Sequence, residues 1–263
     1  MEISKTISAN TEEVDTMKKI AAIVLCSALL LCACAGFGED YSIATDTAFR
    51  PFEYTDKSGE LVGIDVELLA AIAEDQGFTY SIEPMGWDAS IAACQAGMKD
   101  GMMAGASITE ERKASGWIFS DAYFNATQSM AVAQGVSIST FEELKGHSVA
   151  VKAGTLSKDY ADSLAEQYGF KVVTYGSSLA VYMAVTGGEC AACFDDTPAL
   201  EDYILNGGIF LQMVDGTANK GTDYGFVVFS SEKQELVDKF NAGLANIKAN
   251  GKYDEIMAKY LGK

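Results

Sequence analysis

Short apolar runs and longer segments of helical periodicity follow each other along most of the chain. Residues 41–45 and 148–152 are apolar runs of strand length, and residues 65–75 place apolar side chains at helical spacing. Gly77 follows the helical segment and is expected to end it. Strands that alternate with helices of this size indicate an α/β fold with mainly parallel sheets.

The same alternation predicts the other elements. Strands are expected at 78–82, 102–104, 171–174, 191–194, 209–214 and 224–229, and helices at 88–95, 141–144, 157–167, 178–186, 198–205, 232–249 and 253–260. Thr109 is expected to cap one more helix, whose first turn carries two glutamates. These units are too many for one sheet, so the sequence predicts two lobes, joined by strand-like crossings near 129–134 and 221–224.

The N-terminal segment has the pattern of an export signal. Two lysines precede an apolar run at 20–31 that is too short to be a comfortable membrane span. Residues 31–34, Leu-Cys-Ala-Cys, resemble the bacterial lipobox, which implies cleavage before Cys34 and acylation of its thiol. A plain signal peptide and an uncleaved anchor are the alternatives. Acidic residues among the first sixteen positions predict that translation begins at Met17.

Charge and cysteine usage exclude several classes of function. The formal net charge is -18, so nucleic acid is not expected as a partner, because phosphate binding needs a surplus of Lys and Arg. Beyond the N-terminal segment only Cys94, Cys190 and Cys193 remain. The last two have redox-motif spacing, but their surroundings predict a strand, and we interpret them as small buried residues. His147 is the only histidine and has no ligand cluster around it, so no metal and no cofactor is expected.

Four polar loops follow four of the predicted strands, at 45–54, 104–113, 152–155 and 194–198. In open α/β sheets ligands bind beyond the carboxyl ends of the strands, so these loops are the expected place of a site. Together they contain anions, cations and aromatic rings. Such a set is suited to enclosing a small zwitterion.

Six motifs carry a resemblance to a known family. They are "DTAFRPFEYTDKSGELVGIDVELLAAIAEDQG" at 46–77, "GASITEERK" at 105–113, "FSDAYF" at 119–124, "FEELKGHSVAVKAGT" at 141–155, "FDDTP" at 194–198 and "ANGKYDEIMAKYLG" at 249–262. In this order they resemble the family 3 bacterial extracellular solute-binding proteins, which bind polar amino acids, and most of all the glutamine and histidine/lysine/arginine binders. The resemblance implies a two-lobed periplasmic-binding-protein fold of type II, each lobe a central sheet flanked by helices.

The resemblance also implies how the two charged ends of an amino acid are held. Arg112 matches the arginine that binds the ligand α-carboxylate, together with the backbone N–H groups of Ser107 and Thr155. Asp196 matches the carboxylate that holds the α-ammonium group, together with the Ser107 hydroxyl and the Gly105 carbonyl. Taken alone, Arg112 has a plainer interpretation as a solvated residue of a first helical turn, and Asp196 as a helix N-cap.

Five further residues match positions around the ligand side chain. Phe49 and Trp87 match an aromatic pair that sandwiches it, although core aromatics are the commoner case. Asp46 matches the residue that contacts its far end, and Lys152 matches a position used in the glutamine binder. Asp195 stands where the glutamine binder has a histidine. Two aspartates favour a cationic ligand and Lys152 opposes one, so glutamine is the first expectation and a basic amino acid the second.

The resemblance therefore predicts a substrate-binding lipoprotein of an ABC importer. Residues 1–33 are the expected signal region and 34–40 the tether, while one lobe comprises 41–130 and 224–263 and the other 131–223. The implied partners are a free L-amino acid, a permease with its ATPase, and the membrane through Cys34, with the protein a monomer at the cell surface or in the periplasm. Alternatives are an enzyme on the same scaffold, such as cyclohexadienyl dehydratase, and a sensory lipoprotein.

Overall fold

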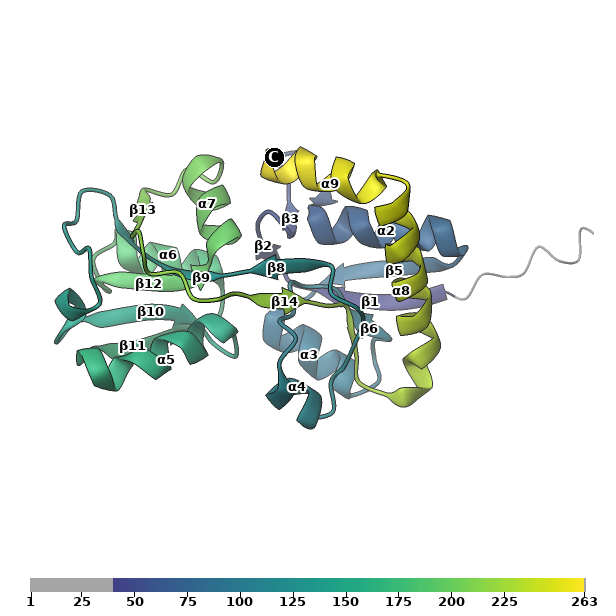
Figure 1. Ribbon diagram of the computed structural model, residues 1–263, viewed down its shortest axis with the longest axis horizontal. Helices are drawn as coiled ribbons and strands as arrows, with labels where there is room; N and C mark the ends of the chain where they lie inside the picture. The colour runs from purple at the N-terminus through teal and green to yellow at the C-terminus, as the bar shows by residue number, and fades with distance from the viewer. Residues whose placement is uncertain (1–39, 263) are drawn as a thin grey trace, which may run out of the picture. The chain divides into compact units, whose positions relative to one another are not determined.

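Two five-stranded sheets, each covered by helices, organise residues 40–262, which are the residues that the computed structural model describes (Figure 1). The strand orders are β5-β1-β6-β15-β7 and β11-β10-β12-β9-β13. The predicted α/β fold with two lobes is confirmed. The predicted signal region, nearly all of the tether and Cys34 lie outside the described residues.

The first lobe is built on β1 (Asp40–Thr45), which is buried and pairs in parallel with β5 (Thr79–Pro84) and β6 (Gly101–Met102). The sheet is completed by β15 (Val227–Val228), which is antiparallel to β6, and by β7 (Ile118–Phe119), which is antiparallel to β15. The helices are α2 (Ile64–Gln76), α3 (Trp87–Gln95), α4 (Glu110–Ala114), α8 (Gln234–Ala249) and α9 (Lys252–Leu261). Gly77 ends α2 in the left-handed conformation, and the Thr109 hydroxyl caps α4, both as predicted.

The second lobe is built on β10 (Ser148–Lys152), which pairs in parallel with β11 (Lys171–Tyr175) and β12 (Ala192–Asp196). The sheet is completed by β9 (Gln128–Ala133), which is antiparallel to β12, and by β13 (Leu211–Met213), which is antiparallel to β9. Its helices are α5 (Leu156–Tyr168), α6 (Ser178–Thr186), α7 (Thr197–Leu205) and the 3-10 turn η1 (Glu142–Leu144). Cys190 and Cys193 are buried free thiols beside and within β12, as interpreted.

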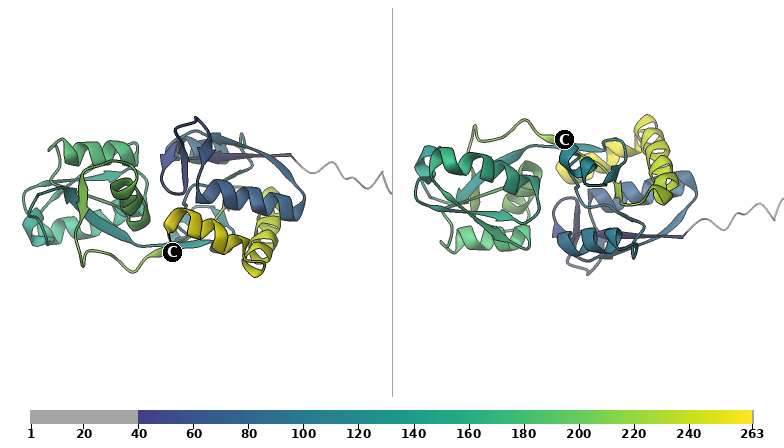
Figure 2. Two further views of the ribbon diagram at one scale, coloured as in Figure 1. Left: turned by 90° about the horizontal axis from the view of Figure 1, so that it is seen from above. Right: turned by 90° about the horizontal axis from the view of Figure 1, so that it is seen from below.

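The crossing between the lobes is a pair of antiparallel strands, β8 (Phe124–Ala126) and β14 (Thr222–Tyr224), which run between the two sheets (Figures 1 and 2). The crossing predicted at 221–224 agrees with β14. The one predicted at 129–134 is wrong, because that run belongs to β9, which pairs on both sides and is almost wholly buried. Its apolar run at 130–133 is typical of a strand that is buried on both faces. Residues 128–130 therefore pair in the second sheet, although the predicted boundary of the first lobe is 130.

Two local features of the structure differ from the elements that the hydrophobic periodicity predicts. The strand predicted at 224–229 is divided between β14 and β15, which belong to different sheets, with η2 (Ser231–Lys233) preceding α8. A small sheet of β2 (Ala48–Phe49), β3 (Glu53–Thr55) and β4 (Leu61–Val62) precedes α2 and was not predicted. Strands of two or three residues are too short to show a period.

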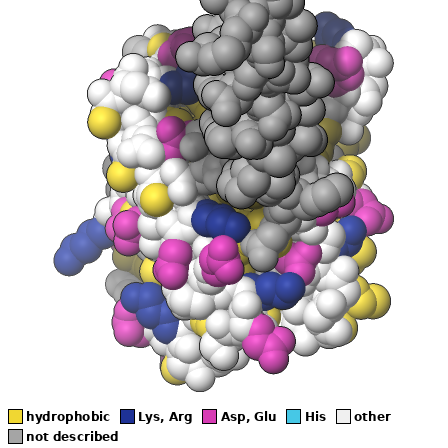
Figure 3. Space-filling view, turned by 90° about the vertical axis from the view of Figure 1, so that its right-hand side faces the viewer, with side chains coloured by type: hydrophobic (Ala, Val, Ile, Leu, Met, Phe, Trp, Pro, Cys, Tyr) yellow, Lys and Arg dark blue, Asp and Glu magenta, His cyan; other side chains and the backbone are white. Residues whose placement is uncertain are grey.

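The surface of the first lobe mixes charges of both signs on the face shown in Figure 3, where acidic and basic side chains are interspersed. The exposed ion pairs Lys259–Glu67 and Lys252–Glu255 are examples of such neighbours in this lobe. Within residues 40–262, no helix combines the length and the apolar character that crossing a membrane requires.

Candidate functional site

One small cavity between the lobes is lined by nine of the ten residues singled out from the sequence. These are Phe49, Trp87, Gly105, Ser107, Arg112, Lys152, Thr155, Asp195 and Asp196. The tenth, Asp46, joins them through an ion pair with Lys152. The open space has a volume of about 20 Å³, which is room for a single water molecule. We call this space the cleft cavity.

The topology explains why residues so distant in sequence meet. Strands β1, β6, β10 and β12 are parallel within their sheets, and their carboxyl ends face the cleft cavity. Asp46 follows β1, Gly105 and Ser107 follow β6, Lys152 ends β10, and Asp196 ends β12. Trp87 and Thr155 enter from the first turn of α3 and from the N-cap of α5.

Lys152 and Asp46 form a buried ion pair that joins the second lobe to the first. The Lys152 ammonium group donates to the Asp46 carboxylate, and each residue is only 4% exposed. The same ammonium group lies 5.3 Å from the ring centroid of Phe49 and 5.5 Å from that of Trp87. Lys152 therefore projects its charge between the two rings expected to enclose a ligand side chain. The alternative interpretation of Lys152 as a surface residue is wrong.

Arg112 is anchored at the rim of the cavity by carbonyl groups of both lobes. Its Nη1 atom donates to the Ser107 carbonyl at 2.8 Å, and its Nη2 atom donates to the Gly154 carbonyl at 3.2 Å. Burial lowers the pKa of the guanidinium group from its usual value, while the nearby carboxylates of Asp159 and Asp196 raise it. The arginine is half-buried and directed into the cleft, so it is not simply a solvated residue of the first helical turn.

Asp196 faces the cavity from the other lobe and is held by three side chains, one of which is Ser157, whose hydroxyl donates at 3.4 Å. Its carboxylate also accepts hydrogen bonds from the Tyr224 hydroxyl and from the Gln128 side-chain amide. Although Asp196 stands at the N-cap position of α7, its side chain makes no capping hydrogen bond, so the plain N-cap interpretation is wrong. Burial, and next the neighbouring Asp195, raise the pKa of Asp196 to about 6.

Asp195 is turned toward the interior of the second lobe. Its Oδ2 atom accepts from the Tyr182 hydroxyl at 2.8 Å, and its Oδ1 atom accepts from the Asp196 backbone N–H at 2.8 Å. Burial raises the pKa of this carboxyl as well. Tyr182, Tyr224 and Gln128 support the two aspartates and were not singled out from the sequence. The pairing of Gln128 with Asp196 is a matter of strand register, which no local pattern shows.

Gly105 allows the backbone of the first lobe to approach the aromatic wall. Its φ of 55° lies in the left-handed region, and a Cβ atom there would lie 2.6 Å from Cε1 of Phe49. The Gly105 N–H donates to the buried carboxylate of Asp65 at 2.8 Å. The loop that offers the Gly105 carbonyl and Ser107 is therefore tied to the core of the lobe.

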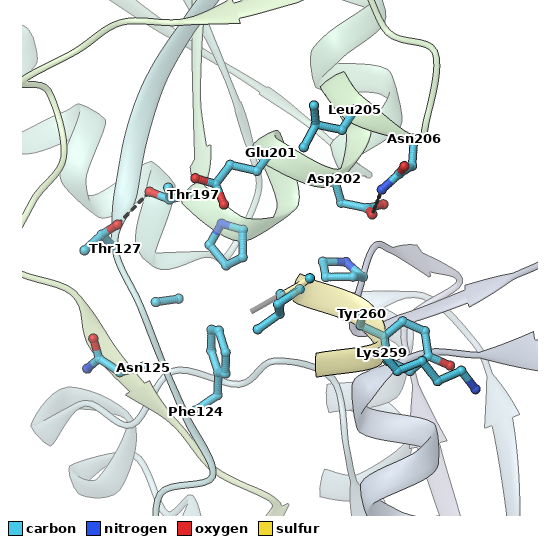
Figure 4. Close-up of a pocket in the computed structure, with 15 residues that line it drawn as sticks. Phe124, Asn125, Thr127, Thr197, Glu201, Asp202, Leu205, Asn206, Lys259 and Tyr260 are labelled. Atoms are coloured by element: carbon cyan, nitrogen blue, oxygen red, sulfur yellow. Dashed lines mark hydrogen bonds between the residues drawn. The ribbon is translucent and has the colours of Figure 1, made fainter. Parts of the chain in front are cut away.

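A second, wider hollow lies on the hinge side, between α7 and α9 and beside β8 (Figure 4). Its volume is about 470 Å³. Thr127 and Thr197 share a hydrogen bond of 2.6 Å in its wall, and the Asn206 amide donates to Asp202 at 2.7 Å. None of the ten predicted residues lines it. We place the candidate site in the cleft cavity because nine of the ten predicted residues line it.

Within the described part of the chain, no group of three or more His, Cys, Asp or Glu side chains is arranged to hold a metal ion. The fold and the cleft cavity define the class of this chain: a two-lobed binding protein of the type II periplasmic-binding-protein fold. The family model of the bacterial extracellular solute-binding proteins, family 3, matches residues 41–263, and the chain belongs to this family.

Two relatives place the chain within the family. A probable histidine-binding protein of Neisseria gonorrhoeae is 31% identical over 264 residues, which cover 94% of this chain and 97% of that protein. An ancestral arginine-binding protein bound to arginine has a solved structure that is 33% identical, covers 85% of this chain and 99% of its own, and matches with a TM-score of 0.78.

A third comparison bears on the placement of the lobes. The second substrate-binding domain of GlnP from Lactococcus lactis, in an open conformation, is 35% identical and covers 87% of this chain and 99% of its own. Its TM-score is only 0.60, although its sequence is no less similar than that of the arginine-bound protein. Hinge closure changes the relative placement of two lobes more than their internal folds. The lobes of this chain are therefore arranged more as in the arginine-bound structure than as in the open one.

Proposed function

We propose that this chain is the extracytoplasmic, lipid-anchored receptor of an ABC importer and binds one free amino acid between its lobes. The observation that carries the proposal is that the Arg112 guanidinium group and the Asp196 carboxylate, from opposite lobes, line one buried cavity. The two groups are complementary to the α-carboxylate and the α-ammonium group of an amino acid. Relatives named for binding histidine and arginine support this class of ligand.

The geometry supports an uncharged polar side chain, glutamine first, in the slot between Phe49 and Trp87. Lys152 already projects a positive charge between these rings and is paired with Asp46. A side-chain amide offers a carbonyl oxygen for the lysine and N–H donors for the aspartate, so it satisfies both partners. A second cation in the same slot would be repelled by the ammonium group of Lys152.

A basic amino acid is the second candidate. The cavity contains two carboxyl groups, Asp195 and Asp196, and Asp46 lies beside it. A cationic ligand could take over the Asp46 carboxylate if the Lys152 side chain turned away. The names of the Neisseria gonorrhoeae relative and of the ancestral protein favour this candidate.

Binding would work through opening and closing of the cleft. A cavity of about 20 Å³ cannot hold an amino acid, so entry requires that the lobes separate or that Lys152 moves. Because the ligand would contact both lobes, binding would favour the closed arrangement. A permease could then distinguish loaded from empty receptor by shape.

Titration calorimetry of the mature protein with a panel of free L-amino acids tests the proposal. We expect one polar amino acid to bind most tightly and Arg112→Ala to weaken it at least 30-fold, because truncating one partner of a buried charge pair costs about 2–5 kcal/mol. Lys113→Ala is the matched control, since Lys113 lies in the same helix but, among residues 40–262, forms its ion pair with the exposed Glu110. Undiminished affinity of the Arg112 variant would end the assignment.

The lipid anchor is a separate part of the proposal and rests on the residues at 31–34. Cells fed a labelled fatty acid should incorporate the label into the wild-type protein and not into Cys34→Ser. Deletion of the gene should abolish uptake of the ligand if the receptor serves import, and leave uptake intact if it serves only sensing. An enzyme on this scaffold, such as cyclohexadienyl dehydratase, would instead turn over prephenate, which we do not expect, because prephenate has no ammonium group for Asp196 to hold.

A further inference from the structure

Two carboxyl groups are buried together behind the cleft cavity. Glu53 in β3 and Asp65 in the first turn of α2 are both 0% exposed. Both oxygens of Glu53 and the Oδ1 atom of Asp65 have no hydrogen-bond partner among the described residues. No described lysine or arginine forms an ion pair with either one, and an isolated buried carboxylate is strongly unfavourable.

The backbone explains why the two groups meet. The Asp65 N–H donates to the Phe52 carbonyl at 2.9 Å, which sets the start of α2 against the strand that carries Glu53. Gly63 makes this approach possible, because a Cβ atom there would lie 2.0 Å from the Phe52 carbonyl oxygen. The side chains of Glu53 and Asp65 are close enough to interact directly.

An ionised carboxylate only accepts hydrogen bonds, so two carboxylates cannot bond to each other unless one carries a proton. Asp65 is already engaged as an acceptor: its Oδ2 atom accepts from the Gly105 N–H and from the Tyr123 hydroxyl, each at 2.8 Å. Two of the three oxygens without a partner, one of Glu53 and Oδ1 of Asp65, would be paired if Glu53 held a proton and donated it to Asp65.

We propose that Glu53 and Asp65 share one proton behind the cleft, and that this pair positions Gly105 and the loop to Ser107 for the ligand. Asp65 is a positioning residue that acts through the Gly105 N–H, and Glu53 keeps the Asp65 carboxylate in place by donating to its other oxygen. The positioning role rests on the proposed amino-acid binding. The shared proton does not depend on that function.

The groups that face the pair are consistent with one retained proton. Asp46 lies on the cleft side and adds negative charge, Lys152 opposes it but is engaged by Asp46, and Tyr123 donates to Asp65. Burial, followed by the charges of Asp65 and Asp46, raises the pKa of Glu53 well above its usual value. Burial raises the pKa of Asp65 to about 7.

The retained proton should make the folded chain less stable as the pH rises. The folded chain retains a proton on Glu53 that the unfolded chain releases above its ordinary pKa of about 4.3. From there up to the raised pKa, this group lowers the folding equilibrium constant about tenfold for each pH unit. Glu53→Gln cannot ionise and keeps an N–H donor for Asp65, so the variant should lose this part of the pH dependence.

Infrared spectroscopy of the ligand-free full chain tests the shared proton directly. At about pH 8, above the usual carboxyl pKa values and above that of Asp65, the wild-type protein should show a protonated carboxyl band that is absent from Glu53→Gln. The exposed Glu60, in the loop between β3 and β4, provides the control: Glu60→Gln should leave the band in place. A wild-type spectrum without any such band overturns the proposal, even if the variant fails to fold.

Denaturation at several pH values and ligand titration complete the test. Glu53→Gln should gain stability relative to wild type as the pH rises, and an identical pH dependence would contradict the shared proton. Asp65→Asn should weaken amino-acid binding about tenfold or more, because Gly105 and Tyr123 would lose a charged acceptor. Undiminished binding by Asp65→Asn overturns the positioning role. A wild-type protein that binds no amino acid would refute the proposed function and leave the spectroscopic result standing.

Discussion

Lys152 and Asp46 lie 106 residues apart and form a buried ion pair that connects the ends of β10 and β1 across the cleft. Breaking a buried pair by removing one partner is costly, because it leaves an uncompensated charge. The ion pair therefore has two effects on the protein. It contributes to contact between the lobes, and it sets the charge that a ligand side chain meets.

Replacing Lys152 is expected to change ligand preference. Lys152→Met removes the positive charge between Phe49 and Trp87 and frees the Asp46 carboxylate. Glutamine affinity should fall about tenfold or more, since hydrogen bonds to charged groups contribute about 1.5–3 kcal/mol, while arginine affinity should rise relative to glutamine. Calorimetry with both ligands measures the ratio. Lys158→Met, which removes a lysine paired at the surface with Asp162, is the control. An equal loss for both ligands would contradict the role in selectivity.

Acid should weaken ligand binding through Asp196. The pKa of this carboxyl is raised to about 6, and only its ionised form attracts an ammonium group. Affinity for an amino acid without a titrating side chain should therefore be full above about pH 6 and fall about tenfold per pH unit below it. Titrations at several pH values check this, and Asp196→Asn should show weak binding with little pH dependence. A profile that stays flat in wild type would mean that Asp196 does not hold the ammonium group.

The stability of the ligand-free protein should respond to Asp196 in the opposite direction. A carboxyl whose folded pKa is raised keeps its proton in the folded chain after the unfolded chain has released it. Between about pH 4 and pH 6 this group therefore makes the ligand-free protein less stable as the pH rises. The difference in melting temperature between wild type and Asp196→Asn should therefore become smaller as the pH falls from about 6 to about 4. A difference in melting temperature that stays constant over this pH range would contradict the raised pKa of Asp196.

Gly105 is expected to tolerate no side chain, because its backbone lies close to the ring of Phe49. Gly105→Ala places a Cβ atom within 2.6 Å of Phe49 in a left-handed backbone, so it should cost about 1–3 kcal/mol of stability and weaken binding strongly. Gly97→Ala is the matched control, because Gly97 also has a positive φ, 69°, but a Cβ atom there meets nothing within 4 Å. Gly97→Ala should lose stability through backbone strain alone and keep its affinity. Equal effects of the two substitutions on binding would show that the contact with Phe49 is unimportant.

The shape of the Arg112 side chain should matter as well as its charge. Arg112→Lys keeps a cation but loses the planar fork that donates to the Ser107 and Gly154 carbonyls while facing a ligand. We expect an affinity loss of about tenfold or more, smaller than that of Arg112→Ala. Competition against a labelled amino acid would rank the three proteins. Full affinity of Arg112→Lys would show that charge alone is sufficient.

Local patterns along the chain were sufficient to predict several of the helices and strands. Helical spacing at 65–75 with Gly77 behind it placed α2, and Thr109 before two glutamates placed the start of α4. The strands β1 and β10 were visible as apolar runs, and their ends pointed to the polar loops. The family motifs then indicated which residues of those loops belong together, and nine of the ten line one cavity.

The contacts that these side chains make could be found only from the folded arrangement of the elements. The crossing was misplaced because β9 is an apolar run in the centre of a sheet, and a run of that kind does not show which sheet it joins. Tyr224 contacts Asp196 from the crossing strand β14, and Glu53 meets Asp65 through a close backbone approach at Gly63. Hydrophobic periodicity shows which face of an element is buried. The contacts of a buried charge depend instead on how distant elements dock, and this is a property of the folded chain.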